Sequence, residues 1–96
     1  MKIIKLPRQA SYPKKVYFRD EVYYIKFKKN FHCYGETDPL KKVITIQSGM
    51  SARETLATLI HELLHVIEFE SPLKVKHKMI YKLERAMVEI LIDNFL

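Results

Sequence analysis

The alternation of apolar and polar positions predicts a β-rich N-terminal half and a helical C-terminal half. Residues 16–18 and 22–27 are rich in β-branched and aromatic side chains, which favour strands. The polar residues 19–21 lie between these two runs. We therefore expect a hairpin over residues 16–27.

A third strand is expected over residues 42–46, where β-branched side chains alternate in direction. This alternation places Ile44 and Ile46 on one face of the strand. The segment from Gly35 to Pro39 contains turn-forming residues and is interpreted as the break before this strand.

A long amphipathic helix is expected from about Ala52 to Glu70. Ser51 and Glu54 form a capping-box pattern, in which the two side chains satisfy free backbone amides at a helix start. On a helical wheel, one side of this helix carries the apolar residues Leu56, Leu59, Ile60, Leu63 and Ile67.

A second helix is expected to begin near Ser71-Pro72, because proline is tolerated at a first helical position, and to run nearly to the C-terminus. Its apolar stripe comprises Met79, Ile80, Leu83, Met87, Ile90 and Leu91. The fold class expected from these elements is α+β, with a small three-stranded sheet followed by two packed helices.

Length and composition fit one small domain spanning residues 1–96. The chain is 48% hydrophobic and 29% charged, and none of its apolar runs approaches the roughly 18 residues of a membrane span. The N-terminal segment is too short and too interrupted for a signal peptide, so we expect a cytoplasmic protein without a membrane partner. Cys33 is the single cysteine, which excludes an internal disulfide and a Cys-x-x-Cys zinc site.

The net charge of +6 comes from 17 Lys and Arg against 11 Asp and Glu. A basic surplus of this size attracts nucleic acid or acidic partners in some proteins. Here the basic residues are dispersed among the expected strands and helix faces, which is also typical of a solvated surface. Nucleic acid therefore stays an alternative partner, and the oligomeric state stays open.

The pentapeptide from His61 to His65 is an HExxH motif inside the first expected helix. Two imidazoles four residues apart lie on one helix face, where both can bind one zinc ion. His61 and His65 lie opposite the apolar stripe, so we expect them to face a cleft. Glu62 then lies beside the metal and can take a proton from a zinc-bound water.

A catalytic zinc usually has three protein ligands, so a third must come from outside the motif. Glu84 ranks first, because it is a carboxylate beside the apolar stripe of the second helix, where an unpaired charge is costly. His77 ranks second, one heptad earlier on the same face, and an ion pair on its own helix is the alternative role for Glu84. Glu68 would strain a closing tetrahedron, and His32 is interpreted as a loop residue.

The motif and its setting resemble the gluzincin class of zinc metallopeptidases. The short chain and the element order resemble the minigluzincins and the small phage-type or ImmA/IrrE-like metallopeptidases. Most of the likeness lies in residues 34–38, 43–46 and 54–65. SprT-like proteins are the second resemblance, because they complete an HExxH site with a third histidine, a role for which His77 is available.

The gluzincin resemblance implies a minimal zincin-like fold, His61, His65 and Glu84 as zinc ligands, and Glu62 as general base and acid. It also implies that a strand beside the cleft, expected to be the third strand at residues 42–46, pairs with an extended peptide substrate. Tyr81, one turn before Glu84, is the candidate to stabilise the oxyanion, with His77 as the alternative. A tyrosine that simply packs with its hydroxyl at the surface is the alternative role for Tyr81.

The function expected from the sequence is therefore that of a zinc metalloendopeptidase acting on a peptide or protein. Its nucleophile is a water activated by zinc and Glu62. Two alternatives stay open at this point. One is a zinc-stabilised binding module without catalysis, and the other is a SprT-like protein associated with DNA.

Overall fold

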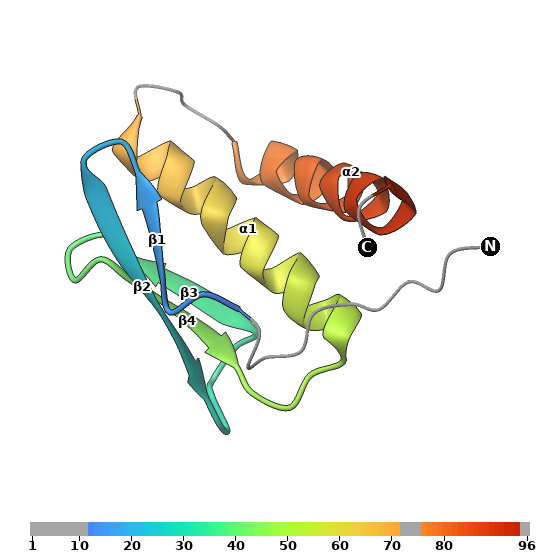
Figure 1. Cartoon of the computed structure of the whole chain (residues 1–96), viewed down its shortest axis with the longest axis horizontal. Coiled ribbons are helices and arrows are strands. Elements are labelled where there is room, and N and C mark those ends of the chain that lie inside the picture. Colours follow the sequence, from blue (N-terminus) through green and yellow to red (C-terminus); the bar gives the residue numbers. More distant parts are fainter. Residues whose placement is uncertain (1–11, 72–75, 95–96) are drawn as a thin grey trace.

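The structure is a computed structural model, and it describes residues 12–71 and 76–94. Two helices and a sheet form three layers, with α1 between the sheet and α2 (Figure 1). The strands are β1 (Lys15–Phe18), β2 (Glu21–Lys28), β3 (Gly35–Asp38) and β4 (Val43–Gln47), and the helices are α1 (Ala52–Glu70) and α2 (His77–Asn94). The chain is thus an α+β protein, as the sequence predicts. The N-terminal segment considered for a signal peptide lies outside the described residues.

The sheet has four strands in the order β1-β2-β4-β3. The β1–β2 hairpin is antiparallel and pairs Phe18 with Glu21, so the expected hairpin is confirmed. β4 returns parallel to β2, which places the two strands richest in apolar residues side by side at the centre of the sheet. β3 pairs antiparallel with β4 and is an edge strand of the described sheet.

The expectation of three strands is wrong, because residues 35–38 form β3 where the sequence indicates only a turn. The segment Gly-Glu-Thr-Asp has little β propensity of its own. Its strand conformation comes from backbone pairing with β4, with Gly35 opposite Ile46 and Asp38 opposite Val43. Tertiary context thus overrides local propensity, and the resulting strand lies beside α1.

The main core lies between the sheet and α1. Tyr23 and Ile25 of β2 and Ile44 and Ile46 of β4 are buried, as the alternation in the sequence predicts for the two β4 residues. Because side chains alternate along a strand, these residues share the face of the sheet that α1 covers. The residues of α1 buried in this cluster are Leu59 and Val66.

The start of α1 confirms the serine half of the predicted capping box, whereas the Glu54 side chain bonds to the Ser51 hydroxyl. The backbone amide of Glu54 donates to Oγ of Ser51 at 3.1 Å. The Ser51 hydroxyl also donates to the Glu54 carboxylate at 2.9 Å. The helix ends at Glu70, so its 19 residues cover the length that the apolar periodicity predicts.

α2 begins at His77, which is later than the start expected near Ser71-Pro72. Pro72, the residue on which the expected start depends, lies outside the described residues. The predicted apolar stripe is only partly buried, because α2 packs on α1 and lies away from the sheet (Figure 1). Ile80 is buried, and Leu91 packs against a second cluster formed by Leu56, Ile60 and Val88. The other residues of the stripe are 40–55% exposed, and they are Met79, Leu83, Met87 and Ile90.

The C-terminal end of α1 is tied to the sheet by a charged hydrogen-bond group. Lys42 Nζ lies 2.6 Å from Glu70 Oε1, and the hydroxyl of the buried Tyr23 donates to the same oxygen at 3.2 Å. The Lys42 hydrogen bond is the main cause of a lowered pKa of Glu70, and burial opposes it. The same hydrogen bond raises the pKa of Lys42.

We expect Glu70→Gln to reduce the acid sensitivity of the fold. A lowered pKa means that the contribution of Glu70 is present above its ordinary value of 4.5 and is lost as the pH falls through the folded-state value. Glu70→Gln should therefore melt at a lower temperature at neutral pH and lose less stability on acidification. Thermal melts between neutral pH and a pH below 4.5 test the expectation, with the exposed Glu89→Gln as matched control. Melting temperatures of wild type and Glu70→Gln that fall in parallel as the pH is lowered would contradict it.

The described part of the chain contains no helix long and apolar enough to cross a membrane.

Candidate functional site

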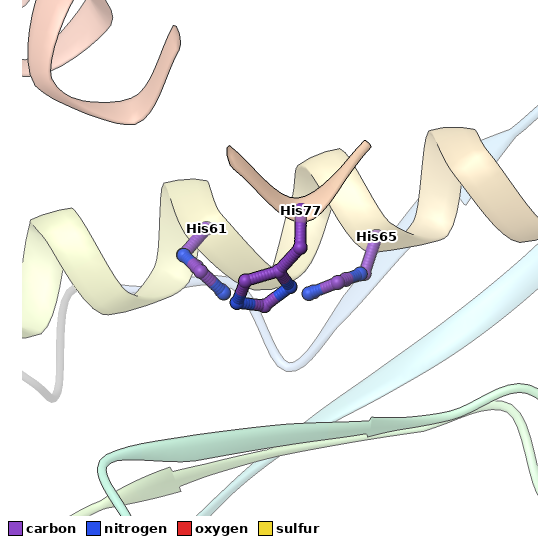
Figure 2. Close-up of side chains that lie close together, drawn as sticks. All are labelled: His61, His65 and His77. Atoms are coloured by element: carbon purple, nitrogen blue, oxygen red, sulfur yellow. The ribbon is translucent and has the colours of Figure 1, made fainter. Parts of the chain in front are cut away.

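Three histidines from two helices converge at the interface of α1 and α2. His61 and His65 lie one turn apart on α1, with ring centroids 5.0 Å apart. His77, the first residue of α2, lies with its ring 5.2 Å from each of the other two. Figure 2 shows the His77 ring between those of His61 and His65. We call these three residues the histidine triad.

The triad has the donor atoms and the spacing for a metal ion. One nitrogen from each ring lies within 4.8 Å of the other two. Zinc is bound by imidazole at about 2.0–2.1 Å, which for a tetrahedral site requires nitrogens about 3.4 Å apart. Small side-chain movements are therefore enough for all three rings to bind one ion.

Two carboxylates orient the rings of His61 and His65. Glu84 Oε1 lies 2.7 Å from Nδ1 of His61, and Glu68 Oε1 lies 2.9 Å from Nδ1 of His65. An ionised carboxylate only accepts hydrogen bonds, so these contacts favour the tautomer in which Nδ1 donates and Nε2 keeps its lone pair. This is the arrangement in which metal-binding histidines are usually held.

Glu84 and His77 therefore have different positions relative to the predicted zinc. Both lie near the HExxH helix, as the sequence predicts. The carboxylate of Glu84 contacts His61, whereas the ring of His77 belongs to the triad. The geometry favours His77 as third donor and Glu84 as the group that orients His61. The ligand role of Glu84 implied by the resemblance stays a prediction.

Glu62 contacts β3 through Thr37. Glu62 is only 5% exposed. The hydroxyl of Thr37 donates to Glu62 Oε1 at 2.8 Å and also contacts the Glu62 carbonyl oxygen at 3.3 Å. This bond fixes one carboxylate oxygen against the edge strand. The sequence has no signal for the role of Thr37, because that role depends on the unpredicted strand β3.

A cavity of about 470 Å³ lies between β3, the loop before it and the two helices. Glu62 and His61 lie in its wall, so a molecule in the cavity meets both the carboxylate and one triad ring. The cavity lining combines residues of three segments, among them Cys33, Gly35, His61, Glu62, Tyr81 and Glu84. Burial is the main cause of a raised pKa of the Cys33 thiol.

Tyr81 lies next to the triad, one turn after His77. Its ring centroid is 4.9 Å from that of His61 and 4.8 Å from that of His77. The side chain is about half exposed and lies in the cavity wall, so its hydroxyl is accessible to a bound molecule. Its predicted role as oxyanion stabiliser stays a prediction.

Comparisons of this chain with protein-family models, curated proteins and solved structures find no match. The interpretation of the site therefore depends on the geometry of these residues and on their chemistry. The sequence indicates the HExxH residues, His77 and Glu84, but it carries no signal that Glu68 contacts His65 as a hydrogen-bond partner.

The close approach of β3 to α1 requires glycine at position 35. A Cβ atom on Gly35 would lie 2.6 Å from Thr58 Cγ2 and 3.2 Å from Glu62 Cγ. A contact of 2.6 Å is not tolerated, so the Thr58 side chain, the strand or the helix would have to move. Gly35 thus sets the distance at which Thr37 can reach Glu62.

We expect Gly35→Ala to destabilise the fold by about 1–3 kcal/mol, the usual cost of overpacking a tight contact. It should also displace Glu62 and lower any activity that depends on it. Urea unfolding measures the first effect. Gly49→Ala is the comparison, because a Cβ there meets no atom within 4 Å and the cost comes only from its positive φ of 86°. A Gly35→Ala protein as stable as wild type would contradict the close approach.

Proposed function

We propose that this chain is a zinc-dependent metallopeptidase. The observation that carries the proposal is the histidine triad, with the Nδ1 atoms of His61 and His65 already held by carboxylates, beside a cavity that contains Glu62. Three neutral nitrogen donors leave a fourth position for solvent or substrate, which distinguishes catalytic from structural zinc sites.

The bound ion would polarise a peptide carbonyl and lower the pKa of water to about 7. Glu62 would take the proton of the attacking water and deliver it to the leaving amine. Thr37 holds Glu62 Oε1, so the other oxygen is available for the water. Tyr81 is placed to donate a hydrogen bond to the developing oxyanion.

An extended peptide is the substrate class that this site favours. The strand expected for this role, residues 42–46, is β4, and it is paired on both sides by β2 and β3. β3 instead ends the order of the sheet and borders the cavity through Gly35, so its outer edge can pair with a substrate backbone. Such pairing would place the scissile carbonyl beside Glu62. We make no proposal on side-chain specificity.

Hydrolysis of an unfolded protein, such as reduced casein, tests the proposal. We expect cleavage by the zinc-loaded protein, loss of cleavage with a chelator, and its return when zinc is added back. Mass spectrometry of the products should show new peptide termini at internal bonds. A zinc-loaded, folded protein that cleaves no peptide bond in casein or in a random peptide mixture would contradict the proposal.

A structural zinc site without turnover is the second candidate. Its support is the modest packing of α2, in which Ile80 and Val88 are the buried residues of the described helix. A metal held by both helices would fasten α2 to α1, because metal binding contributes directly to folding free energy. In this case zinc removal should release α2 while the casein assay stays negative in the loaded protein.

A further inference from the structure

A second group of metal-binding side chains lies in the loop before β3. His32 and Cys33 precede the strand, and Glu36 is its second residue. One ligand atom from each of these residues lies within 4.8 Å of the other two. We call them the loop cluster. They share no residue with the histidine triad, which is built on the two helices.

The backbone of this loop is held in place by β4. The side-chain amide of Gln47, with its nitrogen facing the loop, donates to the carbonyl oxygens of Phe31 at 3.0 Å and Cys33 at 3.2 Å. The backbone amide of Gln47 donates to the Tyr34 carbonyl at 2.8 Å. These bonds fix the backbone on both sides of His32, so little further ordering is needed for its side chain to bind an ion.

The side chains of the cluster already face one another. His32 Nε2 lies 3.3 Å from Glu36 Oε2, and the Cys33 thiol donates to the Gly35 carbonyl at 3.2 Å. The His32 and Glu36 side chains are 71% and 51% exposed. An ion pair this exposed adds little to stability. The arrangement is thus accessible to a metal ion.

We infer that His32, Cys33 and Glu36 form a second metal site, selective for a borderline divalent ion such as Zn²⁺. A thiolate, an imidazole and a carboxylate suit zinc and its neighbours, whereas magnesium and calcium prefer oxygen ligands alone. Three protein ligands leave one position for solvent. Cys33 also lines the cavity that contains Glu62, so an ion bound here would fix one rim of that cavity.

Cobalt binding distinguishes the two sites, because Co²⁺ replaces zinc and a thiolate ligand adds a sulfur-to-cobalt charge-transfer band in the near ultraviolet. The histidine triad contains no sulfur and adds none. We expect the reduced full chain to bind two Co²⁺ ions, one of which produces this band. The band should disappear in Cys33→Ser, and the cobalt affinity read from it should fall by more than about 10-fold in His32→Ala and in Glu36→Gln.

His61→Ala is the control for independence, since it removes a triad donor and leaves the loop unchanged. We expect the band to persist in this variant, with one ion lost. Loss of the band in His61→Ala would mean that Cys33 binds the triad ion, and it would overturn the second site. So would absence of the band in the wild type, or a band that neither His32→Ala nor Glu36→Gln weakens, because the thiol would then bind metal alone. Circular dichroism identifies any variant that fails to fold.

Discussion

Glu62→Gln should lower the rate of peptide hydrolysis by at least about 10²-fold and leave zinc binding nearly intact. General acid–base catalysis contributes typically about 10²–10⁴-fold, and a glutamine cannot accept the proton. Its amide has nearly the same shape and can still accept the hydrogen bond from Thr37, which reaches Glu62 Oε1 at 2.8 Å. The fold should therefore be preserved. Steady-state cleavage of a casein-derived peptide measures the loss.

Glu54→Gln is the matched control for this prediction. Glu54 lies two turns earlier on the same helix, is exposed and lines the same cavity. Glutamine also suits its position in the capping box, so both stability and activity should change little. Equal activity in Glu62→Gln and wild type would refute the catalytic role of Glu62. Equal losses in the two variants would point to an effect of charge in the cavity.

His77→Ala should weaken zinc binding by more than about 100-fold, whereas Glu84→Ala should weaken it by about 10–100-fold. The second range is the usual cost of losing a group that orients a ligand, and loss of a ligand itself should exceed it. The difference follows from the contacts: the His77 ring belongs to the triad, whereas Glu84 contacts Nδ1 of His61 at 2.7 Å. Competition with a chromophoric zinc chelator measures both affinities.

This comparison is best made in a Cys33→Ser background, which removes the thiolate of the loop cluster. Glu68→Ala is the second control, because Glu68 contacts His65 as Glu84 contacts His61. It should resemble Glu84→Ala. A larger loss in Glu84→Ala than in His77→Ala would instead make Glu84 the third ligand, as the gluzincin resemblance implies.

The sequence predicts α1 well because its signals are local. The capping box of Ser51 and Glu54, the apolar period and the breaker after Glu70 all lie within the helix or next to it. The direction of His61 and His65 follows from the same period. The buried positions Ile44 and Ile46 follow from alternation along β4 in the same way.

The parts that the sequence does not predict depend on contacts between distant segments. β3 is a strand because it pairs with β4, and Thr37 reaches Glu62 because Gly35 permits the approach to α1. The choice between His77 and Glu84 depends on where α2 begins. The spacing of His77 and Glu84 along the helix cannot decide which of them is the third ligand, because it places both residues on one face.

The measurement that tests the central claim most directly is anomalous diffraction at the zinc edge from crystals grown with zinc. We expect a strong peak among the rings of His61, His65 and His77, within bonding distance of all three. A second peak at the loop cluster would not affect this claim. A zinc-loaded crystal with no anomalous peak at the histidine triad would contradict it.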